Sequence, residues 1–106
     1  MGCVAEWSES DFDTTLQAEV PVLVDFWSPT CGPCRALVPI LEELAEENDG
    51  DVIIGKVNTT QCPALGARFD IDMLPTLLFF YKGRVVERMT GVQSKHKIQS
   101  ALDEIA

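Results

Sequence analysis

The stretch Val24-Asp25-Phe26-Trp27-Ser28-Pro29-Thr30-Cys31-Gly32-Pro33-Cys34-Arg35 carries two cysteines where two hydrophobic patterns meet. Residues 20–27 are almost continuously apolar and rich in β-branched side chains, which predicts a strand covered on both faces. Residues 37–45 repeat apolar side chains with helical spacing, up to the stop signal Asn48-Asp49-Gly50. The two cysteines are therefore expected where a buried strand leads into a long amphipathic helix.

This position predicts different roles for the two cysteines. Cys31 lies at or just before the start of the helix, where unpaired N–H groups and the helix dipole favour a thiolate. Cys34 lies one turn further on, on the inner side, close enough to form a disulfide with Cys31. Pro33 costs no hydrogen bond in the first turn, and its fixed φ stiffens the motif. The pattern indicates a redox-active pair, with Cys31 as the nucleophile and Cys34 as the resolving thiol.

Two other interpretations of the pair stay open at this point. A CxxC motif can be half of a structural zinc site, but zinc needs four ligands, and Cys3, Cys62 and His96 form no second pair at ligand spacing. The two cysteines can also be inert, although their place between strand and helix is the context that a redox motif requires. We therefore expect no metal. Cys62 is either an inert, partly buried thiol or a site of regulatory oxidation, and no role is assigned to Cys3 or His96.

Length, composition and charge exclude several classes of protein. A chain of 106 residues with 46% hydrophobic and 24% charged residues predicts one globular domain spanning residues 1–106. A net charge of −9, with eight lysines and arginines, argues against nucleic acids and anionic membranes as partners. The chain starts without the basic and apolar pattern of a secretory signal, and its apolar runs are too short to span a bilayer. A cytoplasmic location is expected.

The other patterns complete an α/β fold. The expected further elements are a helix over 10–18, a strand over 52–57, a short helix from Pro63 through Phe69, a hairpin of strands 76–81 and 84–89, and a final helix capped by Ser94. Ser8 and Asp11 have the spacing of a capping box for the first helix, and residues 3–7 are a candidate additional strand. Helices and strands alternate along the first part of the chain, and a hairpin follows. This order predicts a central mixed sheet of four to five strands with helices on both faces.

Six segments follow one another in an order that points to a known family. They are Val24-Asp25-Phe26-Trp27, Cys31-Gly32-Pro33-Cys34-Arg35, Pro39-Ile40-Leu41, Lys56-Val57-Asn58, Leu74-Pro75-Thr76-Leu77 and Gly91. Together they resemble the thioredoxin family, and the resemblance covers essentially the whole chain. It implies the thioredoxin fold and a protein that reduces protein disulfides without a bound cofactor, through the redox-active disulfide Cys31–Cys34. Because Gly-Pro between the cysteines goes with a strongly reducing pair in that family, the resemblance also implies such a pair here, with Gly32 and Pro33 in the motif.

The resemblance also implies roles for two charged residues. Asp25 corresponds to a buried acid behind Cys34, where burial raises its pKa and allows it to accept a proton when the second thiol attacks. Lys56 corresponds to the lysine that neighbours this acid. From the sequence alone, Asp25 can instead lie at an exposed strand end and Lys56 at a solvated strand edge.

A shallow apolar groove beside the disulfide is the third implication. The resemblance assigns to this groove, or to the support beneath it, Trp27, Thr30, Leu74, Pro75, Thr76, Gly91 and Val92. Pro75 is expected to follow a cis peptide bond. Thr30 stands where the family has a tryptophan, so the rim of the groove offers a partner protein less contact area. We expect this difference to affect the range of substrates or the fit to a thioredoxin reductase. The acidic face of the long helix is expected to lie mostly away from the groove.

The function expected from these observations is thiol-disulfide exchange. The chain would act as a monomer on disulfide-containing proteins and be recycled by thioredoxin reductase or a similar donor. Two alternatives remain: a specialised thioredoxin-like reductant dedicated to one partner, and a redox-sensing binding module that uses the same groove.

Overall fold

The computed structural model describes residues 4–105, so Cys3 lies outside the described residues. The elements are β1 (Ala5–Glu6), α1 (Glu9–Thr15), β2 (Val22–Trp27), α2 (Gly32–Glu47), β3 (Ile53–Asn58), α3 (Pro63–Arg68), β4 (Thr76–Tyr81), β5 (Arg84–Thr90) and α4 (Lys95–Ile105). Their order is the one predicted, including the candidate strand near the start of the chain.

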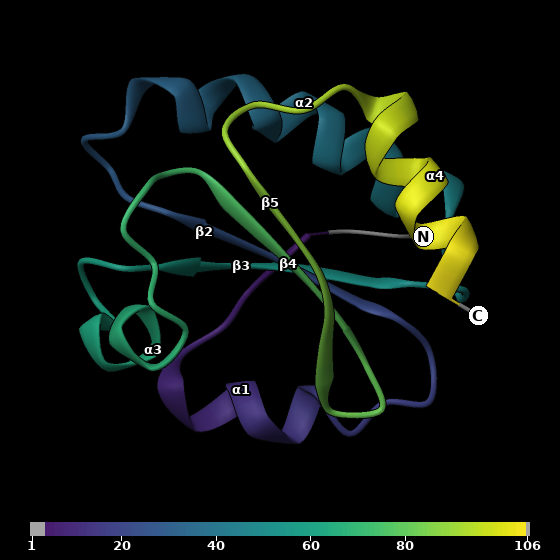
Figure 1. Ribbon diagram of the computed structural model, residues 1–106, viewed down its shortest axis with the longest axis horizontal. Coiled ribbons are helices and arrows are strands. Elements are labelled where there is room, and N and C mark those ends of the chain that lie inside the picture. The colour runs from purple at the N-terminus through teal and green to yellow at the C-terminus, as the bar shows by residue number, and fades with distance from the viewer. Residues whose placement is uncertain (1–3, 106) are drawn as a thin grey trace.

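The strands form one mixed sheet in the order β1-β3-β2-β4-β5. Strands β1 and β2 both run parallel to β3, whereas β4 pairs antiparallel with β2 and with β5. Helices α1 and α3 cover one face of the sheet, and α2 and α4 cover the other (Figure 1). The predicted mixed α/β sheet with helices on both faces is confirmed, with five strands.

Side chains of β2 point alternately to the two faces of the sheet and contribute to two separate core clusters. Val22, Val24 and Phe26 pack in the cluster that includes Phe12 of α1 and Leu65 of α3. Leu23 packs in the other cluster, under α2 and α4. Because successive side chains of a strand point to opposite faces, Asp25 shares the face of Leu23 and lies beneath α2. The register of β2 thus decides where this carboxyl group lies.

The first helix and the strand after it are shorter than predicted. Helix α1 ends at Thr15 rather than at residue 18, and β2 begins at Val22 rather than at residue 20. The expected capping box does not form, because the Ser8 hydroxyl donates to the Asp11 carboxylate (2.9 Å) instead of capping a backbone N–H. Pro21, which lacks an N–H group, precedes β2, and the strand ladder starts after it.

The C-terminal part follows the predicted turn and cap chemistry. Lys82 and Gly83 both have positive φ (51° and 82°), as a two-residue hairpin turn between β4 and β5 requires. The Ser94 hydroxyl accepts a hydrogen bond from the backbone N–H of Lys97 (3.1 Å), which confirms Ser94 as the cap of α4. Strand β5 runs one residue further than predicted, to Thr90.

Candidate active site

Cys31 and Cys34 form a disulfide at the start of α2, with Cα atoms 5.4 Å apart. Cys31 is the N-cap residue in extended conformation, and its Sγ accepts a hydrogen bond from the backbone N–H of Cys34 (3.2 Å). The Cys31 N–H in turn donates to the carbonyl of Ser28 (3.1 Å). Cys31 is half-buried and Cys34 is buried. The predicted position of the pair, with Cys31 at the helix start and Cys34 on the inner side, is confirmed.

Asp25 is buried beneath α2, with 3% of its surface exposed, and so does not lie at an exposed strand end. Its Oδ1 atom has no hydrogen-bond partner among the described residues. Burial raises the pKa of Asp25 to about 7, because the charged carboxylate loses its hydration. The nearby charge of Lys56 lowers this pKa in part, and that of Glu6 raises it.

Lys56 lies beside Asp25 in the neighbouring strand, since the two residues are register partners between β2 and β3. The lysine is half-buried, and its Nζ lies 5.2 Å from the centroid of the Trp27 ring. A cation over an aromatic face is held by the electrostatic field of the ring. Lys56 therefore acts on the carboxyl group of Asp25 through its charge while its ammonium group rests on Trp27.

A small pocket of about 90 Å³ connects the buried acid with the disulfide. It is lined by Asp25, Trp27, Ser28, Pro29, Cys31, Cys34, Arg35, Val38 and Lys56. The structure thus brings together five of the residues selected from the sequence. The sequence analysis missed the other four lining residues: Ser28 and Pro29 directly follow Trp27, and Arg35 and Val38 follow Cys31 at helical spacing.

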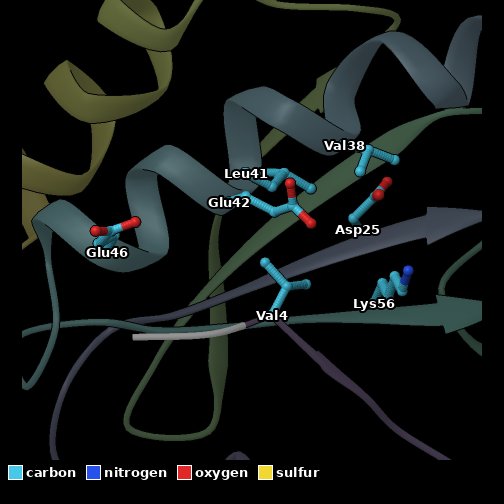
Figure 2. A pocket seen from close by; sticks show the side chains of 7 residues that line it. All are labelled: Val4, Asp25, Val38, Leu41, Glu42, Glu46 and Lys56. Atoms are coloured by element: carbon cyan, nitrogen blue, oxygen red, sulfur yellow. The ribbon is translucent and has the colours of Figure 1, made fainter. Parts of the chain in front are cut away.

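A larger pocket of about 390 Å³ also reaches Asp25. In Figure 2, Val38, Leu41, Glu42 and Glu46 of α2 and Val4 surround it together with Asp25 and Lys56. Glu42 and Glu46 of α2 thus line the pocket that Asp25 also lines, and Glu46 lies at its far end from Asp25 (Figure 2). None of the expected groove residues lines this pocket, so the expectation that the acidic face of α2 lies mostly away from the groove stays a prediction. Helical periodicity identifies an acidic face but not how the helix is rotated on the sheet.

The expected groove residues lie at the start of β4 and the end of β5. The Leu74–Pro75 bond is cis, as the resemblance implies, and Pro75 accepts a hydrogen bond from the Gly91 N–H (2.8 Å). Pro75 and Thr76 are buried, whereas Val92 is 45% exposed. Leu74 is half-buried and packs against the core cluster that contains Phe12. None of these groove residues lines the small pocket with the cysteines.

Two residues near the groove and the motif modify the expected surface. Met73 is 54% exposed and precedes Leu74, so it offers an apolar side chain that the sequence analysis did not select. Its signal was an apolar residue directly ahead of the Leu-Pro pair. Thr30 is exposed, and its hydroxyl lies 3.3 Å from that of Ser28. The rim directly ahead of Cys31 therefore presents the small polar side chain of Thr30, whereas Ser28 is buried.

The other candidate groups lie apart from this site. Cys62 is buried in the core cluster of α1 and α3, which favours the inert interpretation, and His96 is exposed on α4. Within residues 4–105, no group of three or more His, Cys, Asp or Glu side chains is arranged to hold a metal ion. No helix in the described part of the chain is both long and apolar enough to cross a membrane.

Comparison with known proteins places these features in a wider group. A family model described as Thioredoxin matches residues 3–104. The chain is 38% identical over 98 residues to a thioredoxin of Alicyclobacillus acidocaldarius subsp. acidocaldarius, covering 92% of this chain and 93% of that protein. It is 36% identical over 105 residues to thioredoxin 1 of Nostoc sp., covering 98% of both. It is also 38% identical over 89 residues to the chloroplastic M-type thioredoxin of Spinacia oleracea, where the match covers 84% of this chain and 49% of that relative.

Proposed function

The chain belongs to the thioredoxin family of thiol-disulfide oxidoreductases, and we propose that it reduces disulfides of other proteins through the specific residues described above. One observation carries the proposal: a disulfide at a helix start, with the half-buried Cys31 ahead of the buried Cys34, shares a pocket with a buried carboxyl group. The redox group is the disulfide itself. The chemistry therefore depends on which sulfur a substrate reaches first and on where the protons go.

In the reduced protein, the Cys31 thiolate attacks one sulfur of a substrate disulfide. A mixed disulfide forms between Cys31 and the substrate, and the other substrate sulfur leaves as a thiolate that takes up a proton. Cys34 then loses its proton and attacks Cys31 Sγ, which releases the second substrate thiolate and closes the Cys31–Cys34 disulfide. Two electrons pass from the protein to the substrate. The greater exposure of Cys31 supports this order of attack.

Asp25 is the base proposed for the second step. It lines the same pocket as Cys34 and has a pKa of about 7, so a useful fraction is ionised at neutral pH. A carboxylate with this pKa accepts the Cys34 proton and returns it to solvent later in the cycle. Lys56 keeps part of the carboxyl group ionised by opposing the effect of burial. Trp27 supports the pocket from β2 and holds Lys56 in place.

The groove of Leu74, Pro75, Thr76, Gly91 and Val92 is proposed to hold the substrate chain next to the disulfide. Val92 and Met73 each leave a large apolar side chain about half exposed, and such exposed apolar groups support a role in binding a partner. The hydrogen bond between Gly91 and Pro75 keeps the two sides of the groove together.

The wider setting is part of the proposal. The chain would work as a single domain and a monomer in the cytoplasm, and would carry electrons from thioredoxin reductase or a similar donor to disulfide-containing proteins. The charge of −9 supports protein partners over nucleic acids or anionic membranes.

Reduction of insulin driven by dithiothreitol tests the proposed activity, with Cys31→Ser and Cys34→Ser beside the parent. The parent should accelerate reduction well above the dithiothreitol background. Neither variant should do so, because each lacks one of the two sulfurs. A parent rate equal to the background would contradict the proposal and leave a redox-sensing binding module as the better account.

Thr30 favours a second candidate, a reductant dedicated to one partner. A small exposed residue ahead of Cys31 leaves less contact area at the rim than an aromatic ring. The test compares the parent and Thr30→Trp as substrates of a standard NADPH-dependent thioredoxin reductase. A clearly higher turnover of the variant supports specialisation, whereas unchanged turnover removes the importance given to Thr30.

A further inference from the structure

Residues 69–75 connect α3 to β4 and carry Met73, Leu74 and Pro75 to the groove. The end of this connection is fixed by β4 and β5: the Thr76 hydroxyl donates to the Met73 carbonyl, and Gly91 donates to Pro75. Further back, the Ile71 N–H donates to the carbonyl of Gly66 (2.8 Å). This hydrogen bond holds the start of the connection to α3, and a second attachment ties it to the sheet.

Arg88 provides that attachment from the exposed edge strand. Its Nη1 donates to the carbonyl of Phe69 (2.8 Å) and its Nη2 donates to the carbonyl of Asp70 (2.8 Å). The partners are 18 and 19 residues away in sequence, so the contact ties β5 to the connection across the fold. A planar guanidinium group with fixed N–H directions can serve two neighbouring carbonyls at once, which a lysine ammonium cannot do with the same geometry.

The two carbonyls belong to a point where the chain turns sharply. Asp70 has a positive φ of 53°, a conformation that costs energy in residues other than glycine and that persists when its surroundings fix it. The Phe69 ring is anchored at the same point, with ring centroids 5.5 Å from Phe80 and 5.6 Å from Phe12. The ring fixes the side chain of residue 69, and Arg88 fixes the backbone direction that follows it.

We propose that Arg88 is a positioning residue for the substrate groove: by holding the Phe69 and Asp70 carbonyls, it sets the path of residues 71–74 and so the place of Met73 and Leu74 in the proposed groove. The inference rests on the proposed function, because it concerns the groove through which protein substrates are held. Arg88 itself is exposed and lines neither the small pocket with the cysteines nor the larger pocket at Asp25. Its loss should therefore affect the binding of large substrates and leave the sulfur chemistry unchanged.

The test measures single turnovers of the reduced protein against increasing insulin and, separately, against a small aromatic disulfide. Acid quenching and thiol counting give the limiting rate and the half-saturating insulin concentration. Arg88→Ala should raise that concentration about three- to tenfold, because binding must then order the connection. The limiting rate and the rate constant for the small disulfide should stay within about twofold of the parent. Arg88→Lys keeps the charge and most of the stem, and should recover only part of the loss.

Arg84→Ala is the matched control, since Arg84 is an exposed arginine on the same strand and should behave like the parent. The proposal is overturned if Arg88→Ala leaves the half-saturating concentration unchanged, if Arg84→Ala raises it equally, or if the small disulfide is slowed as much as insulin. Failure of both Arg88 variants to fold would also overturn it, because Arg88 would then serve overall stability. A parent that reduces the small disulfide but not insulin would refute the proposed function itself, and the inference with it.

Discussion

Replacement of Asp25 by asparagine should stabilise the folded protein at neutral and alkaline pH and have little effect at about pH 4. The carboxyl group has an ordinary pKa of 3.8 and a pKa of about 7 in the folded protein, because burial opposes its charge. Between these two values the folded state keeps a proton that the unfolded state releases. The stability of the parent therefore falls as the pH rises through this window, and the loss is complete above pH 7.

The difference of about three pKa units corresponds to about 4 kcal/mol of unfolding free energy. Asparagine has a similar shape and does not titrate, so it avoids this loss. The stability of Asp25→Asn relative to the parent should grow from under about 1 kcal/mol at about pH 4 to about 4 kcal/mol at about pH 8. Any constant cost of burying the amide contributes equally at both pH values and cancels from the change.

Urea unfolding with the disulfide intact measures this change, at several pH values between these limits. The difference between variant and parent removes the contribution of all other titrating groups. Asp51→Asn, at an exposed position, is the control for the loss of one negative charge. A stability difference between Asp25→Asn and the parent that does not change with pH would refute the claim that burial holds the pKa of Asp25 near neutrality.

Three further predictions follow from other parts of the structure. Asp25→Asn should slow closure of the Cys31–Cys34 disulfide about tenfold or more at about pH 8, and the closure rate of the parent should rise through pH 7 as the carboxylate forms. Quenched-flow detection of the mixed disulfide measures both rates. Equal closure rates in the variant and the parent would remove Asp25 as the base. Gly55→Ala should destabilise the fold by about 1–3 kcal/mol in urea, because an added Cβ would overlap the buried Trp7 ring, whereas Gly32→Ala, with open space around it, serves as the control. Ser94→Ala should cost about 1 kcal/mol through loss of the α4 cap, and a Ser94→Asp variant that fails to restore stability would argue against capping.

The sequence was sufficient for those features that depend on local patterns. Helical spacing and the Cys-Gly-Pro-Cys motif place α2 and its N-cap, and Lys82-Gly83 marks the hairpin turn. The place of Asp25 beneath α2 was beyond this approach, because β2 is apolar on both faces and no alternation shows which pair of helices covers a given side chain. Only the resemblance pointed to it.

Contacts between distant segments were also out of reach. The hydrogen bonds from the Arg88 side chain to the carbonyls of Phe69 and Asp70 join two segments that come together only once the sheet has formed. The failure of the capping box at Ser8 has a different cause, since the hydroxyl finds the Asp11 carboxylate as a competing acceptor. Pattern rules give the residues that can pair, and the tertiary structure decides among the partners.

The most direct test of the central claim is the mass of the covalent complex formed by Cys34→Ser with oxidised insulin. Without the resolving thiol, the reaction should stop at the mixed disulfide, and peptide mapping should find the substrate attached to Cys31. Cys31→Ser should give no such complex at Cys34, because Cys34 is buried. A complex attached through Cys34, or no complex with Cys34→Ser, would contradict the order of attack on which the account depends.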